Sequence, residues 1–150
     1  MPEFAYQDIE AWHTAVKLAA STGRLKIGSN LKASADAQAH AFEQAGLAAA
    51  LIAEGSAREG PGQAGLYRDA RGSLAQCRAW LHVLAAVTNE NESVFLNEFE
   101  LAEQASRQVS ALIRSGERGP GAPGARPPMR PAPGGPGPRP AGPPRGGAPR

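Results

Sequence analysis

Residues 66–87 read LYRDARGSLAQCRAWLHVLAAV, and small or apolar side chains recur in this stretch at steps of three and four residues. The recurring positions are Leu66, Ala70, Ser73, Cys77, Trp80, Leu84 and Val87. This is the heptad spacing of a helix that packs along one face against other helices at a shallow angle. The stretch therefore predicts a long amphipathic helix in an all-α protein.

Three further segments of the chain repeat the same spacing. Their expected inner positions are Ile9, Trp12, Val16 and Ala19; Leu31, Ala35, Gln38, Phe42, Ala45, Ala49 and Ile52; and Phe95, Phe99, Ala102, Ser106, Val109 and Ile113. Glycine and asparagine in residues 23–30, 55–62 and 89–91 separate the segments. Four helices with short connections predict an antiparallel up-down-up-down four-helix bundle over residues 1–115.

Residues 116–150 form a C-terminal tail of a different composition. Of its 35 residues, 12 are Pro and 10 are Gly, and none is Leu, Ile, Val or aromatic. Such a segment has too little apolar surface to offset the entropy of ordering it, so we expect a disordered tail with local polyproline II character.

Charge is divided unevenly between these two parts. The tail carries six Arg and one Glu, a net charge of +5, whereas residues 1–115 carry ten Lys or Arg and thirteen Asp or Glu, a net charge of −3. A partner drawn by positive charge would meet the tail first. The polar, acidic N-terminus does not resemble a signal peptide, and no uncharged run is long enough to cross a bilayer. We expect a cytoplasmic protein without a membrane segment.

Residues 45–53, AGLAAALIA, contain no polar side chain over two and a half helical turns. A helix that is apolar on every side is normally buried on every side, which favours self-association. The alternative is that alanine is simply a good helix former on a solvent-facing surface.

Two short motifs resemble the paired signature of the 23S rRNA-intervening-sequence proteins, also called four helix bundle proteins. The first is Ile52, Ala53, Glu54 and Gly55, followed by Arg58, and the second is Ala70, Arg71, Gly72, Ser73 and Leu74. The opening residues Phe4, Ile9, Trp12, Ala15 and Leu18 are similar to that family's first helix. The resemblance covers residues 4–115, departs from the family at Gln76, where an acid is usual, and lacks the usual Asn before the first motif.

This resemblance implies a four-helix bundle that assembles into a ring, commonly a homopentamer, and it does not imply an enzyme. Some members are encoded within insertions in ribosomal RNA genes. A related group, the accessory variability determinants of retroelements, consists of similar pentameric bundles that engage a reverse transcriptase and nucleic acid.

Residue types that carry catalysis are sparse. His13, His40 and His82 fall on three different segments without metal-ligand spacing, so we expect surface histidines and no metal or cofactor. Cys77 is the only cysteine and lies on an inner heptad position, which indicates a small core residue. We therefore expect no catalytic residues and no enzymatic activity.

Glu54 and Arg58 have the i,i+4 spacing of a helical ion pair, which would hold the turn into the third helix. We expect Gly55 to occupy the left-handed position after the second helix and Gly72 to let the second and third helices approach closely.

Arginine provides the candidate nucleic-acid contacts. Arg68, Arg71 and Arg78 share one outward sector of the third helix, where they could hold phosphates or form an ordinary solvated surface. The tail adds Arg126, Arg130, Arg139, Arg145 and Arg150. The leading hypothesis is a non-enzymatic oligomeric scaffold that contacts RNA or DNA, or a nucleic-acid enzyme such as a reverse transcriptase, with low and salt-sensitive affinity. The alternative is a module that docks protein partners through its proline-rich tail.

Overall fold

Four α-helices account for most of residues 5–118, the part of the chain that the computed structural model describes. They are α1 (Glu10–Arg24), α2 (Lys32–Ser56), α3 (Gly60–Thr88) and α4 (Leu96–Glu117). A short 3-10 helix precedes α1 (η1, Ala5–Asp8), and another precedes α4 (η2, Glu92–Phe95). Residues 5–118 contain no strand, so the predicted all-α class is confirmed.

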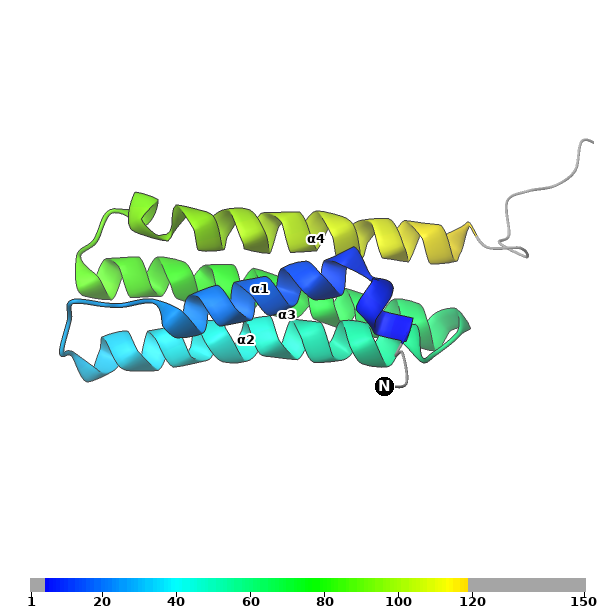
Figure 1. Cartoon of the computed structure of the whole chain (residues 1–150), viewed down its shortest axis with the longest axis horizontal. Helices are drawn as coiled ribbons and strands as arrows, with labels where there is room; N and C mark the ends of the chain where they lie inside the picture. The colour runs from blue at the N-terminus through cyan, green and yellow to red at the C-terminus, as the bar shows by residue number, and fades with distance from the viewer. Residues whose placement is uncertain (1–4, 119–150) are drawn as a thin grey trace, which may run out of the picture. The chain divides into compact units, whose positions relative to one another are not determined.

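Successive helices run in opposite directions, as Figure 1 shows. Helix α1 packs against α2 and α4, and α3 packs against the same two neighbours, so the order around the bundle follows the chain. This is the predicted up-down-up-down topology. The predicted bundle ended at residue 115, but α4 continues through Glu117. The predicted disordered tail otherwise lies outside the described residues.

Alanine makes up most of the buried face of α2. Five of its eight buried residues are alanines: Ala37, Ala41, Ala45, Ala48 and Ala49. Small side chains let helix axes approach closely. The larger buried side chains come from the neighbouring helices and from the C-terminal part of α2: Leu18, Ile52, Leu74, Leu81, Leu84, Phe95 and Val109.

Two glutamines each form hydrogen bonds with the C-terminal end of the helix that comes before them in the chain. The Nε2 atom of Gln38 donates to the backbone oxygens of Thr22 (2.9 Å) and Leu25 (3.0 Å), at the end of α1. The Nε2 atom of Gln63 donates to the backbone oxygens of Gly55 (3.2 Å) and Arg58 (3.0 Å), at the end of α2. Helix ends leave carbonyl groups without partners, so these bonds link each helix to the next.

The residues that we predicted to face the core are buried more often in α3 and α4 than in α1 and α2. Ala70, Ser73, Cys77 and Leu84 are buried on α3, as are Phe95, Ala102, Val109 and Ile113 on or just before α4. In contrast, Val16, Leu31, Ala35 and Phe42 are exposed. The prediction for these four residues is wrong because alanines on other sides of α1 and α2 supply an alternative apolar face that permits closer packing.

The first signature motif lies where α2 turns into α3. Arg58 Nη2 donates to Glu54 Oε1 at 3.0 Å, which confirms the predicted ion pair. Ile52 is fully buried, Ala53 is half-buried, and Gly55 is buried inside α2, so the predicted left-handed position for Gly55 is wrong. A Cβ added at Gly55 would lie 2.7 Å from the ring of the buried Tyr67.

The second motif differs from its prediction at Gly72. Ser73 is buried, but Gly72 is exposed, and a Cβ there would meet nothing within 4 Å. The close approach of α2 and α3 that we expected at Gly72 therefore lies at Gly55 instead. The reason is that Gly72 and Ser73, although adjacent, point in directions about 100° apart on a helix.

Replacing Gly55 with Ala should lower the free energy of unfolding by about 1–3 kcal/mol, because the new methyl group would collide with the Tyr67 ring. Replacing Gly72 with Ala is the matched control, and it should raise stability by about 0.5–1 kcal/mol, since alanine is the better helix former in open space. Urea denaturation followed by circular dichroism measures both. Equal effects of the two substitutions would contradict this account of the motif.

Candidate functional site

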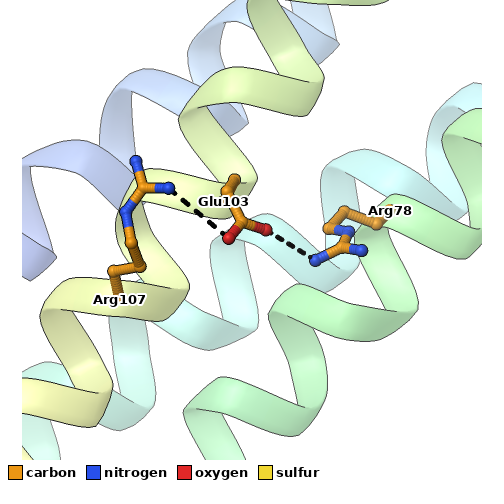
Figure 2. Close-up of polar contacts among 3 residues, drawn as sticks. All are labelled: Arg78, Glu103 and Arg107. Carbon is orange, nitrogen blue, oxygen red and sulfur yellow. Dashed lines mark hydrogen bonds and ion pairs between the residues drawn. The ribbon is translucent and has the colours of Figure 1, made fainter.

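The seam between α3 and α4 is held on its outer side by arginines. Arg68 pairs with Glu117 (2.9 Å), and Arg71 Nη1 donates to Ser110 Oγ (3.3 Å). Glu103 lies between two arginines, as Figure 2 shows: its Oε2 is 2.9 Å from Arg78 of α3, and its Oε1 is 3.5 Å from Arg107 of α4.

A groove of about 570 Å³ follows this seam. Its charged lining consists of four arginines and one glutamate, a net charge of +3, together with two serine hydroxyls. The lining residues are Arg71, Ala75, Arg78, Glu103, Ser106, Arg107, Ser110 and Arg114. Towards the start of α4 it meets a smaller hollow of about 340 Å³ that shares Arg78, Glu103 and Arg107 and adds His82, Phe99 and Glu100. We call the two together the α3–α4 groove.

The four arginines of this groove alternate between its two walls. Contacts of Arg71 with Ser110 and of Arg78 with Glu103 define the register of the antiparallel helices. In that register Arg114 comes first along the axis, followed by Arg71, Arg107 and Arg78, at steps of three or four residues. Each step is about 4.5–6 Å along a helix axis. The groove therefore presents a ladder of cations at regular intervals.

The predicted arginines have different positions relative to this groove. Arg71 and Arg78 line it, whereas Arg68 lies outside the lining and is paired with Glu117. All three belong to α3 and face α4, so the predicted outward sector is one wall of a groove between two helices. The tail arginines Arg126, Arg130, Arg139, Arg145 and Arg150 lie outside the described residues.

Sequence reasoning missed Arg107 and Arg114. They are seven residues apart on α4, the same spacing as Arg71 and Arg78 on α3. Seven residues are two helical turns, so each pair shares one face of its helix. The equal spacing of these two arginine pairs could have predicted the second wall of the groove, because neighbouring antiparallel helices place one face of each side by side.

The three histidines lie on the surface, as predicted. His13 Nε2 is 2.6 Å from the backbone oxygen of Gln7. The His40 ring stacks on Trp80, with centroids 4.3 Å apart, and His82 is 2.7 Å from Glu92 and packs against Phe99. Within residues 5–118, no three His, Cys, Asp or Glu side chains cluster in a way that could hold a metal ion.

Cys77 is fully buried in the core. Burial, and secondarily the negative charge of Glu98, raises the pKa of the Cys77 thiol to about 12. A thiol with such a pKa is almost entirely protonated at neutral pH and therefore a poor nucleophile. This agrees with the predicted role as a core residue.

The Cys77 thiol should couple folding to alkaline pH. Its pKa is higher in the folded state (about 12) than its ordinary value of 9.0, so the folded state binds more protons between these values. Stability should therefore fall as pH rises through that window, by roughly 1 kcal/mol per pH unit. Cys77→Ala is the control. A wild-type protein that loses no more stability than this variant between pH 9 and pH 11 would contradict the prediction.

Comparison with known proteins adds no family to this description, because no family model, curated protein or solved structure matches the chain. None of the helices within residues 5–118 is long and apolar enough to cross a membrane.

Proposed function

We propose that this protein is a non-enzymatic, oligomeric scaffold of the cytoplasm that binds the phosphate backbone of nucleic acid along the α3–α4 groove. The observation that carries the proposal is the ladder of Arg114, Arg71, Arg107 and Arg78. Arginine matches phosphate in charge and in hydrogen-bond geometry. The axial steps of about 4.5–6 Å are of the same order as the length of one extended nucleotide, so successive arginines can meet successive phosphates.

The existing partners of these arginines do not compete strongly with a phosphate. Arg71 bonds only a neutral hydroxyl, and Arg114 forms no ion pair within residues 5–118. Arg78 and Arg107 share Glu103, and all three side chains are 43–68% exposed. Exposed ion pairs stabilise proteins by only about 0–1 kcal/mol, so a phosphodiester can replace them at small cost.

The tail extends the same electrostatic pattern along the sequence. Residues 116–150 carry a net charge of +5, and they begin in the last turn of α4, the helix that forms one wall of the groove. If several copies assemble, their tails act together and weak contacts add through avidity. Nucleic acid would thus meet positive charge both in the groove and in the tail, although residues 1–115 are net negative.

Full-length protein should bind labelled RNA without sequence preference, and the affinity should fall steeply between low and physiological salt as counterions are displaced. Arg107→Ala/Arg114→Ala should weaken binding and reduce the slope of log K against log salt by about 0.7 for each lost phosphate contact on a single strand. Glu103→Gln should strengthen binding, because it removes the acid that is paired with two of the four arginines. Fluorescence anisotropy at several salt concentrations measures all three.

Arg58→Ala is the matched control, since it removes an exposed arginine that lies outside the groove. Deleting residues 119–150 measures the contribution of the tail to RNA binding. In the Arg107→Ala/Arg114→Ala variant this deletion should remove most of the RNA affinity that remains. If full-length protein fails to bind RNA at low salt, the nucleic-acid proposal is wrong and the alternative of protein docking through the tail takes its place.

The scaffold part of the proposal depends on an apolar face between α2 and α3. The stack of His40 on Trp80 marks where these helices meet at the surface. Leu47 follows His40 by two turns on α2 and is 44% exposed, and Val83 follows Trp80 by one turn on α3 and is 41% exposed. Because the two helices are antiparallel, Leu47 and Val83 lie on opposite sides of the stacked rings along the bundle. Leu47 lies within residues 45–53, the segment that favoured self-association. We infer that copies of the chain meet on this face, in a ring of five as the family resemblance implies.

Residues 1–118 should have the mass of a homo-oligomer, a pentamer, by light scattering at tens of micromolar. Leu47→Glu/Val83→Glu should give monomers with unchanged helix content, because charges in an apolar contact must lose their hydration. Leu31→Glu alters a leucine that is 58% exposed near the start of α2 and should leave the mass unchanged. A monomeric wild-type fragment would refute the assembly.

A further inference from the structure

A second hollow, of about 580 Å³, lies on the other side of α4, between α1 and the first turn of α4. It is lined by Lys17, Ala20, Ser21, Arg24, Leu25, Lys26, Asn97, Glu98 and Leu101. It shares no residue with the α3–α4 groove. Its volume falls within the range of about 300–1,000 Å³ that is typical of small-molecule sites. We call it the α1–α4 pocket.

Glu98 is the one buried carboxylic acid among residues 5–118, with 4% of its surface exposed. Its Oε1 accepts hydrogen bonds from the Ser21 hydroxyl and from Asn97 Nδ2 (3.3 Å), and Asn97 also donates to Ser21 (3.0 Å). Its position in the first turn of α4 suits a negative charge. Its other oxygen, Oε2, accepts no hydrogen bond within the described residues and is not enclosed by protein atoms, so it can accept a hydrogen bond from a ligand in the pocket.

Three cations line the same pocket without acidic partners. Lys17, Arg24 and Lys26 are exposed, and none forms an ion pair within residues 5–118, whereas Lys32, Arg58, Arg68, Arg78 and Arg107 do. Together with Glu98 they give the pocket a net charge of +2. A dianionic group would neutralise it, and a phosphate monoester carries about −1.5 to −2 at pH 7.

The remaining lining is apolar and comes from Ala20, Leu25 and Leu101. The pocket thus combines cations for a phosphate, a free carboxylate oxygen for a hydroxyl donor, and an apolar wall for a flat ring. Ribonucleotides carry all three groups. We propose that the α1–α4 pocket binds a ribonucleotide with a terminal phosphate, free or at the 5′ end of an RNA strand.

In the bound state the phosphate lies among Lys17, Arg24 and Lys26, and a ribose hydroxyl donates a hydrogen bond to Oε2 of Glu98. An acidic side chain that accepts from ribose hydroxyls is a recurring device in nucleotide sites. Ser21 and Asn97 hold the carboxylate in place through Oε1. This assignment is independent of nucleic-acid binding in the α3–α4 groove.

Titration of the full-length protein with adenosine 5′-monophosphate, followed by amide NMR shifts of Ser21, Asn97 and Glu98, tests the proposal. We expect saturable binding with a Kd at or below about 1 mM. Adenosine, which lacks the phosphate, and the 2′,3′-dideoxy nucleotide, which lacks the hydroxyls, should each bind at least about tenfold more weakly. A short RNA with a 5′-phosphate should shift the same amides. Its Kd should be lower than that of the free nucleotide if the strand end is the ligand, and no lower if the free nucleotide is the ligand.

Lys17→Ala/Arg24→Ala/Lys26→Ala changes only exposed side chains and should abolish the response, and Glu98→Gln should remove the preference for the ribose over the dideoxy form. Lys32→Ala removes an exposed lysine elsewhere and should have no effect. Arg107→Ala/Arg114→Ala should also leave nucleotide binding intact, so a failure of the groove proposal is distinguishable from a failure of this one. No shift at millimolar nucleotide, or binding that survives the triple substitution, would overturn the assignment.

Discussion

The alanine face of α2 is the constraint on which the rest of the bundle depends. A face built from Ala37, Ala41, Ala45, Ala48 and Ala49 fills little volume, so the neighbouring helices must come close to exclude water. The larger side chains that complete the core then belong mainly to those neighbours. At the end of α2, Gly55 continues the same principle, because only a residue without a Cβ leaves room for the Tyr67 ring.

Close packing around α2 also determines which apolar side chains are exposed to solvent. Phe42 has the size of a core residue but is 49% exposed, and its ring lies against Gly23, where an added Cβ would be 3.1 Å from it. Leu47 and Val83 are exposed as well. This exposed apolar surface is where we propose that another copy of the chain binds.

Helix α4 has a different role, since both candidate sites use it. Side chains between Phe99 and Arg114 supply one wall of the α3–α4 groove, whereas Asn97, Glu98 and Leu101 line the α1–α4 pocket. Opposite sides of one helix thus carry two positively charged hollows. The net negative charge of residues 1–115 hides this, because acids elsewhere in the bundle outweigh these local clusters in the sum.

The all-α class, the four helices and the inner faces of α3 and α4 could be predicted from the sequence, because apolar and small residues recur there with a clear heptad period. The sequence also determined the Glu54–Arg58 pair, which depends only on local helix geometry. It could not determine the inner faces of α1 and α2, since alanine is apolar on every side and leaves the rotation of a helix open. Only the tertiary structure decided that rotation, and with it the register that interleaves arginines from α3 and α4 and the burial of Glu98 beside Ser21. These features depend on which helix faces meet, and that choice follows from packing density across the whole bundle.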